Sequence, residues 1–133
     1  MGGCVETAMG QKILIVDDDA SIRLLLNTYL ERQGYTVLAA PDGPTAIDLY
    51  RTEQPDLVVM DIAMPKMDGF ETAAHLRAIQ AEEDRPHTPI IVLTAYARSF
   101  FVSTGTEPYI DSYQTKPISP DQLLRHIRQF LGG

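Results

Sequence analysis

The sequence predicts an α/β domain of five parallel strands and about five helices in strict (βα)5 alternation. First, short runs of aliphatic and β-branched residues alternate with longer segments whose apolar residues recur at helical spacing. Second, 133 residues with 44% hydrophobic content suit one domain with a buried core. Third, the first and third apolar runs end in aspartates, at Asp17 and Asp61. A sheet of strand order 2-1-3-4-5 makes these two strands neighbours, so their acids would meet at one edge.

The first half of the chain holds two strand–helix pairs. Ile13–Val16 is the first expected strand. The helix that follows has Asp19 as a plausible N-cap and Gly34 as a plausible stop. The second strand is expected at Tyr35–Ala40, and Pro44 suits the first turn of the second helix.

The second half continues the alternation. Leu57–Asp61 is the third expected strand, and Asp68 is placed to cap the helix after it. Ile90–Leu93 is expected as the fourth strand and Ser112–Thr115 as the fifth. Ser119 then caps the last helix.

The segment from Arg98 to Asp111 is expected to lack a standard fourth helix. It is poor in helix formers, and Gly105 and Pro108 would end any helix early. At most a short helix over Ala97–Thr104 is expected, followed by an irregular stretch.

Composition and charge narrow the classes of partner. The net charge of −7 argues against nucleic acid as a direct partner. No apolar run is long enough to span a bilayer, and the start of the chain lacks the regions of a signal peptide. A cytoplasmic protein without membrane contact is therefore expected. Residues 1–10 are expected to form a flexible N-terminal tail and residues 11–133 the single domain.

Polar side chains stand at the ends of four expected strands: Asp17 and Asp18, Asp61, Thr94 and Lys116. In an open parallel sheet, ligands bind at the carboxyl ends of the strands. Crowded acids repel one another unless a cation lies among them, and oxygen ligands suit a hard cation such as Mg²⁺. These groups would therefore make a site for a metal ion and a phosphoryl group.

Each of these residues also fits an ordinary structural role. If Asp19 caps the first helix, Asp17 and Asp18 could simply be solvated. Thr94 is a common type of strand-end residue, and an isolated Lys116 would be solvated as well. Asp68 is interpreted as a helix cap and kept out of the site. The three histidines show no pattern of partner ligands and are expected at the surface: His75, His87 and His126.

Five short motifs follow one another between about Lys12 and Leu131: Ile-Val-Asp17-Asp18, Pro55-Asp-Leu-Val-Val-Met-Asp61, Met64-Pro-Lys-Met-Asp68-Gly69, Leu93-Thr94-Ala95 and Tyr113-Gln-Thr-Lys116-Pro117. Each motif alone is weak, but their joint order and spacing are specific. Together they resemble the receiver domain of two-component response regulators, as in a chemotaxis-regulator-like single-domain receiver. The resemblance implies the flavodoxin-like fold with strand order 2-1-3-4-5, here with an atypical fourth-helix region.

The resemblance also implies a role for each residue at the strand ends. Asp61 would be the phosphoacceptor, attacking a phosphohistidine of a histidine kinase or phosphotransfer protein to form an aspartyl phosphate. Asp17, Asp18 and the backbone carbonyl of Ala63 would hold Mg²⁺ together with Asp61. Lys116 would pair with the phosphoryl oxygens.

Further implications concern the response to phosphorylation. Thr94 would bond a phosphoryl oxygen, and Tyr113 would follow it inward as an aromatic switch, although Tyr113 alone would be interpreted as core-edge packing. The Lys116–Pro117 peptide bond is expected to be cis, which would aim Lys116 at Asp61. The chain would signal by contact with an unknown downstream protein and would catalyse only its own phosphorylation and dephosphorylation. Because the fourth helix commonly contributes to the signalling face of the family, that face is expected to differ here.

Two other functions stay open. A pseudo-receiver would act as a phosphorylation-independent interaction module; the retained acids argue against it, and the irregular fourth-helix region argues for it. An aspartate-nucleophile phosphatase on a similar fold would need an Asp-x-Asp motif, whereas Asp61-Ile62-Ala63 lacks the second acid.

Overall fold

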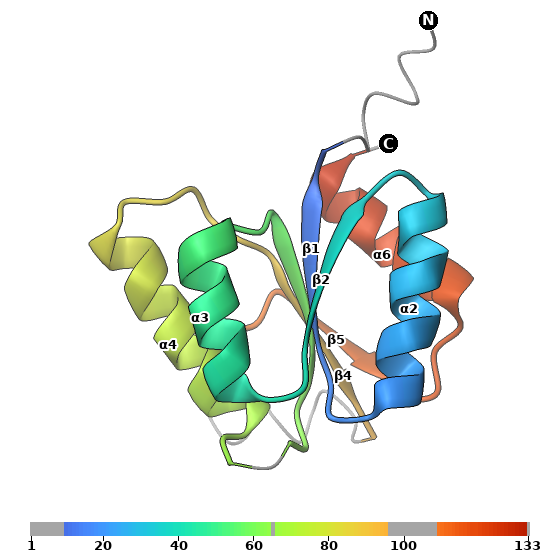
Figure 1. The fold of residues 1–133 in the computed structure, drawn as a ribbon, viewed down its shortest axis with the longest axis horizontal. Helices are drawn as coiled ribbons and strands as arrows, with labels where there is room; N and C mark the ends of the chain where they lie inside the picture. Colours follow the sequence, from blue (N-terminus) through green and yellow to red (C-terminus); the bar gives the residue numbers. More distant parts are fainter. Residues whose placement is uncertain (1–9, 65, 96–108, 133) are drawn as a thin grey trace, which may run out of the picture.

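The computed structural model describes residues 10–64, 66–95 and 109–132. They form a five-stranded parallel sheet in the order β2-β1-β3-β4-β5, which confirms the expected fold and topology (Figure 1). The elements are β1 (Lys12–Val16), α2 (Ala20–Arg32), β2 (Thr36–Ala40), α3 (Gly43–Glu53), β3 (Leu57–Asp61), α4 (Gly69–Glu82), β4 (Ile90–Thr94), β5 (Ser112–Thr115) and α6 (Pro120–Leu131).

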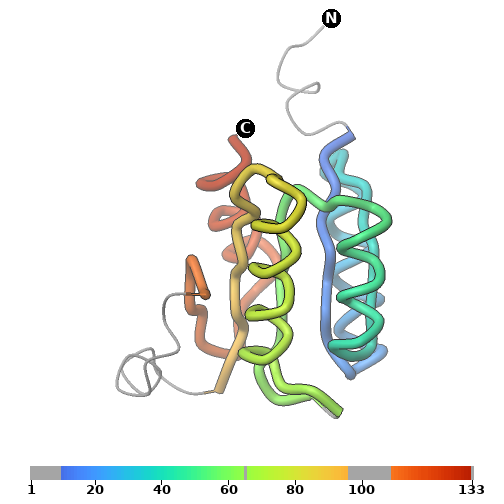
Figure 2. The backbone as a smooth tube through the Cα atoms, turned by 90° about the vertical axis from the view of Figure 1, so that its left-hand side faces the viewer, coloured from blue at the N-terminus to red at the C-terminus, as the bar shows by residue number. Residues whose placement is uncertain are grey.

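Helices cover both faces of the sheet, so the described residues form two separate apolar clusters. Helices α3 and α4 lie side by side over one face, while α2 and α6 cover the other (Figures 1 and 2). Strand β1 shows the consequence: Leu14 and Val16 belong to the cluster beneath α3 and α4, and Ile13 and Ile15 to the cluster beneath α2 and α6. Burial on both faces explains why the central strands read as continuous apolar runs rather than alternating ones.

Side-chain caps fix where the helices begin. Asp19, Asp68 and Ser119 each accept hydrogen bonds from backbone amides in the first turn of the following helix, as expected. At Ser119 the side chain of Gln122 returns a bond to the cap amide and completes a capping box. These caps set the ends of the loops that carry the polar strand-end residues.

Some details differ from expectation. Strand β2 begins at Thr36 rather than Tyr35, because the Tyr35 amide still donates to the Leu30 carbonyl at the end of α2. Leu25 and Phe130 follow the apolar spacing of their helices, yet 55% and 39% of their surfaces are exposed. The prediction of an atypical fourth-helix region falls largely on residues 96–108, which lie outside the described residues, as does most of the predicted N-terminal tail.

Asp42 is an additional helix cap, at the start of α3, that was not predicted from the sequence. Its Oδ1 accepts a hydrogen bond of 2.9 Å from the Thr45 amide at the start of α3, and Lys66 Nζ lies 3.1 Å from its Oδ2. The bond from Thr45, with a further contribution from Lys66, lowers the pKa of Asp42 to about 2. The folded protein therefore favours the ionised form of this carboxyl more strongly than the unfolded chain does.

We expect Asp42 to contribute to the acid sensitivity of the fold. The unfolded pKa of an aspartate is about 3.9, so the stabilisation is complete above that pH and is lost as the pH falls toward 2. Asp42→Asn keeps a good capping residue but removes the titration. Urea unfolding at several pH values should show a shallower loss of stability between pH 5 and 2 in this variant. Asp48→Asn, at an exposed position on the same helix, is the control; equal slopes in both variants would contradict the assignment.

Candidate functional site

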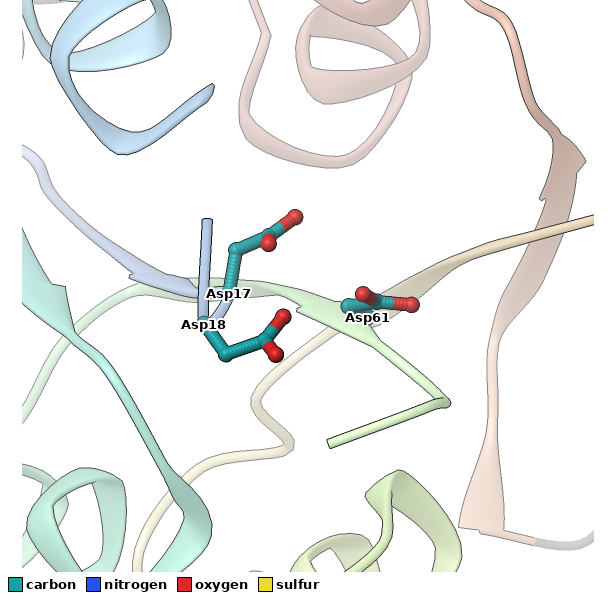
Figure 3. Close-up of side chains that lie close together, drawn as sticks. All are labelled: Asp17, Asp18 and Asp61. Carbon is teal, nitrogen blue, oxygen red and sulfur yellow. The ribbon is translucent and has the colours of Figure 1, made fainter. Parts of the chain in front are cut away.

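Three carboxylates meet at the carboxyl edge of the sheet. Asp17 and Asp18 directly follow β1, and Asp61 ends β3, whose Met60 is in register with Val16. One carboxylate oxygen from each acid lies within 4.8 Å of those of the other two (Figure 3). Asp17 and Asp61 are buried, whereas Asp18 is exposed. The topology thus brings together acids that are more than forty residues apart in the sequence.

The loop after β1 is fixed by hydrogen bonds around Asp17. Its Oδ1 accepts a bond of 2.9 Å from the Asp19 amide, and its backbone carbonyl accepts one of 2.7 Å from the Arg23 guanidinium. Arg23 was not predicted as a site residue from the sequence. The signal would have been a basic residue in the first turn of the helix after the acids, from which a long side chain can reach back to the strand end.

Lys116 supplies positive charge to this cluster. Its Nζ lies 3.3 Å from Asp61 Oδ2 and 3.6 Å from Asp17 Oδ2. Its backbone amide donates to the Thr94 carbonyl at the end of β4, and the Lys116–Pro117 bond is cis, as expected. The structure therefore places the predicted lysine beside the predicted phosphoacceptor.

Thr94 lies on β4, which pairs with β3, and Tyr113 lies on β5, the next strand beyond β4. Thr94 ends β4 and is 2% exposed, one residue beyond Leu93, which is in register with Asp61. Tyr113 lies on β5 in register with Val92 and packs, partly buried, against the apolar cluster beneath α3 and α4. Thr94 is thus at the same edge as the acids, while the switch role of Tyr113 stays a prediction.

Asp61 is followed by a loop that approaches it closely. The Ala63 amide donates to Asp61 Oδ1 at 3.2 Å; the role of the Ala63 carbonyl as a metal ligand stays a prediction. At the end of the loop the Gly69 amide donates to the Ile62 carbonyl at 3.0 Å. A Cβ atom on Gly69 would lie only 2.9 Å from the backbone oxygen of Asp61 and the Cα of Ile62. Gly69 thereby allows α4 to begin directly against the strand end that carries Asp61.

We expect Gly69→Ala to lower the stability of the fold. The added methyl group would overlap backbone atoms, which cannot rotate away as the end of a side chain can. Overpacking of this kind costs about 1–3 kcal/mol, measurable as a lower urea midpoint in chemical unfolding. An unchanged midpoint would show that the loop can withdraw from α4 without cost.

The charges of the site favour a bound cation. Burial raises the pKa of Asp17, and the neighbouring Asp61 and Asp18 raise it further, against the opposing effects of the Asp19 amide and Lys116. Three acids thus face one ammonium group among the described residues of this cluster. The donor set consists of carboxylate oxygens and contains no sulfur or imidazole, which fits Mg²⁺.

Comparison with known families gives a single consistent result. Residues 13–128 match the response regulator receiver domain. The chain belongs to this family. The receiver domain is 42% identical over 123 residues to the alkaline phosphatase synthesis transcriptional regulatory protein PhoP of Bacillus subtilis, covering 92% of this chain and 49% of that protein. It is 39% identical to an uncharacterized 14.6 kDa protein of Leptolyngbya boryana, covering 95% and 94% of the two chains.

Solved structures agree with the family assignment. The chemotaxis protein CheY4 of Vibrio cholerae superimposes with a TM-score of 0.81 at 31% identity, covering 93% of this chain and all of that one. The receiver domain spans about half the length of the first curated relatives that it matches, which include PhoP. No helix in the described part of the receiver domain is long and apolar enough to cross a bilayer.

The histidines lie apart from this site. His75 and His87 are exposed and His126 is partly exposed, in agreement with their interpretation as surface residues. His87 Nε2 lies 2.7 Å from Asp111 Oδ1, a contact that was not predicted.

Proposed function

We propose that this receiver domain accepts a phosphoryl group on Asp61 from a phosphohistidine of a histidine kinase or phosphotransfer protein in the cytoplasm. The observation that carries the proposal is the position of the Asp61 carboxylate, 3.3 Å from Lys116 Nζ and grouped with Asp17 and Asp18. An acid nucleophile beside fixed positive charge and metal ligands is the arrangement that phosphoryl transfer requires.

The transfer is one displacement at phosphorus. A carboxylate oxygen of Asp61 forms the new P–O bond as the P–N bond to the donor imidazole breaks, so the imidazole leaves with the electron pair of that bond. Asp17, Asp18 and Asp61 would hold Mg²⁺, which when bound neutralises charge on the phosphoryl oxygens. Lys116, whose Nζ lies 3.3 Å from Asp61 Oδ2, provides a further positive charge that would stay near the product as a counter-charge.

The aspartyl phosphate would then act on residues of β4 and β5. The Thr94 hydroxyl would bond a phosphoryl oxygen, and Tyr113 would follow as a switch toward a downstream protein. We propose no reaction other than the phosphorylation and dephosphorylation of the domain itself. Ala63 stands where an aspartate-nucleophile phosphatase would have the second acid of its Asp-x-Asp motif. Contact with nucleic acid is not part of the proposal, given the net charge of −7. A pseudo-receiver is disfavoured because the acids and the lysine are all retained and grouped.

The proposal is tested by incubating the purified chain with acetyl phosphate in the presence and absence of Mg²⁺. We expect an acid-labile phosphoryl group that requires Mg²⁺ and that mass spectrometry of peptides locates on Asp61. Failure to incorporate phosphate would favour the pseudo-receiver, and phosphate on another residue would reject Asp61 as the acceptor.

A further inference from the structure

The guanidinium group of Arg77 binds the residues just before β5. Arg77 on α4 donates from Nε and one terminal nitrogen to the Tyr109 carbonyl, at 3.2 and 3.0 Å. The same terminal nitrogen lies 2.7 Å from Asp111 Oδ2, and the other donates at 2.7 Å to the Thr88 carbonyl and at 2.9 Å to Gln80 Oε1. The side chains of Arg77 and Asp111 are only 15% and 21% exposed. We call the contacts of Arg77 with Tyr109 and Asp111 the Arg77 clasp.

Asp111 links the clasp to the start of β4. Its Oδ2 also accepts a bond of 2.8 Å from the Ile90 amide, while the Asp111 amide donates to the Ile90 carbonyl at 3.0 Å. His87 contacts the other carboxylate oxygen. Tyr109 and Asp111, just before β5, are therefore bound to α4, and Asp111 is also bound to β4. A partly buried ion pair with this many fixed hydrogen bonds holds geometry better than an exposed one.

The position of β5 matters because it carries Lys116. Within the described sheet, β5 is a four-residue edge strand paired with β4, and Lys116 follows its last residue directly. Lys116 Nζ lies only 3.3 Å from Asp61 Oδ2. A displacement of β5 by much less than one strand residue, which is about 3.3 Å, would therefore already separate the two groups.

We propose that Arg77 is a positioning residue for phosphoryl transfer, acting through Tyr109 and Asp111 to hold β5, and with it Lys116, in place beside Asp61. This inference rests on the proposed function of Asp61. Arg77 touches none of the reacting groups, so its effect is on the placement of the lysine. Asp17 and Asp18 directly follow β1 and Asp61 ends β3, so the grouping of these acids does not depend on the clasp.

Arg85 offers a matched control. Its guanidinium is also held by several contacts: it donates at 2.6 Å to the Tyr50 carbonyl and at 2.9 Å to the Arg51 carbonyl, and lies 4.7 Å from the centre of the Tyr50 ring. Its side chain is 9% exposed, and its contacts are with α3 and Glu83 rather than with β5. Arg85→Met therefore removes a comparable structural anchor without releasing β5.

The experiment compares Arg77→Met and Arg85→Met in the full chain. The rate of phosphorylation at saturating acetyl phosphate and Mg²⁺ should fall in Arg77→Met by about 10- to 100-fold, the range expected when a reacting group is misplaced by up to about 1 Å. The Mg²⁺ concentration at half saturation, followed by amide chemical shifts, should stay unchanged. Arg85→Met should keep the wild-type rate at a similar loss of stability. Equal rates in the two variants would overturn the proposal.

A second measurement separates this inference from the proposed function. The Lys116 amide, which donates to the Thr94 carbonyl, should exchange its hydrogen faster in Arg77→Met than in Arg85→Met, and Asp111→Asn should act in the same direction. If the wild-type chain takes up no phosphate, the proposed function fails, and faster exchange still supports the clasp. Equal exchange of the Lys116 amide in Arg77→Met and Arg85→Met overturns the positioning role of the Arg77 clasp, even if the wild-type chain is phosphorylated.

Discussion

Replacing Asp61 by asparagine is expected to abolish the acyl phosphate completely. Asp61 ends β3 and is only 8% exposed. Because the two side chains are nearly isosteric, the amide should fit this position without disturbing the fold. An amide lacks the anionic oxygen that attacks phosphorus, so no amount of Mg²⁺ or phosphodonor should restore the product. The measurement is mass spectrometry of the intact protein after incubation with acetyl phosphate, together with circular dichroism to verify folding.

Asp68→Asn is the control for this variant. Asp68 lies seven residues further along, is exposed and caps α4, a role that asparagine fills equally well. The Asp68→Asn protein should be phosphorylated to the same extent as the wild-type chain. Phosphate on a folded Asp61→Asn protein would show that another residue is the acceptor.

The second large effect is expected from Asp18→Asn, which should weaken Mg²⁺ binding and block phosphorylation at ordinary Mg²⁺ concentrations. Loss of even a supporting partner of a metal ligand costs about 10–100-fold in affinity. Loss of a carboxylate from the cluster is therefore expected to cost at least about 10-fold. Calorimetric titration of the chain with Mg²⁺ measures this directly.

Asp19→Asn serves as the matched variant, because Asp19 is the adjacent acid but caps α2 through the Ser21 amide. It should titrate with Mg²⁺ as the wild-type chain does. An Mg²⁺ titration of Asp18→Asn that matches the wild type would remove Asp18 from the site.

Much of the site could be predicted because it depends on where strands end. Asp17 and Asp61 stand at the ends of apolar runs, and the order of parallel strands makes those runs neighbours. Side-chain contacts between distant elements were not predictable in this way. Arg77 and Asp111 are 34 residues apart, and Lys66 and Asp42 are 24 apart, in loops or on helices whose relative positions follow only from the packed structure.

Helix faces show a second limit of sequence patterns. The apolar spacing of α2 includes Leu25, which is 55% exposed, because the helix contacts the sheet along a narrower strip than its apolar residues occupy. The predicted irregular fourth-helix region stays a prediction, since residues 96–108 lie outside the described residues. Its reasons, Gly105 and Pro108, are local and do not depend on the rest of the fold.

The crowding of acids around Lys116 has a consequence for protein engineering. Asp17 and Asp61 are buried and share one ammonium group, so removing either charge should relieve repulsion and desolvation. Such variants are expected to gain thermal stability while losing the chemistry of the site. A screen of this domain that rewards heat resistance alone would therefore enrich inactive proteins at these positions. A sensor built from this domain would have to be selected for phosphoryl uptake and stability together.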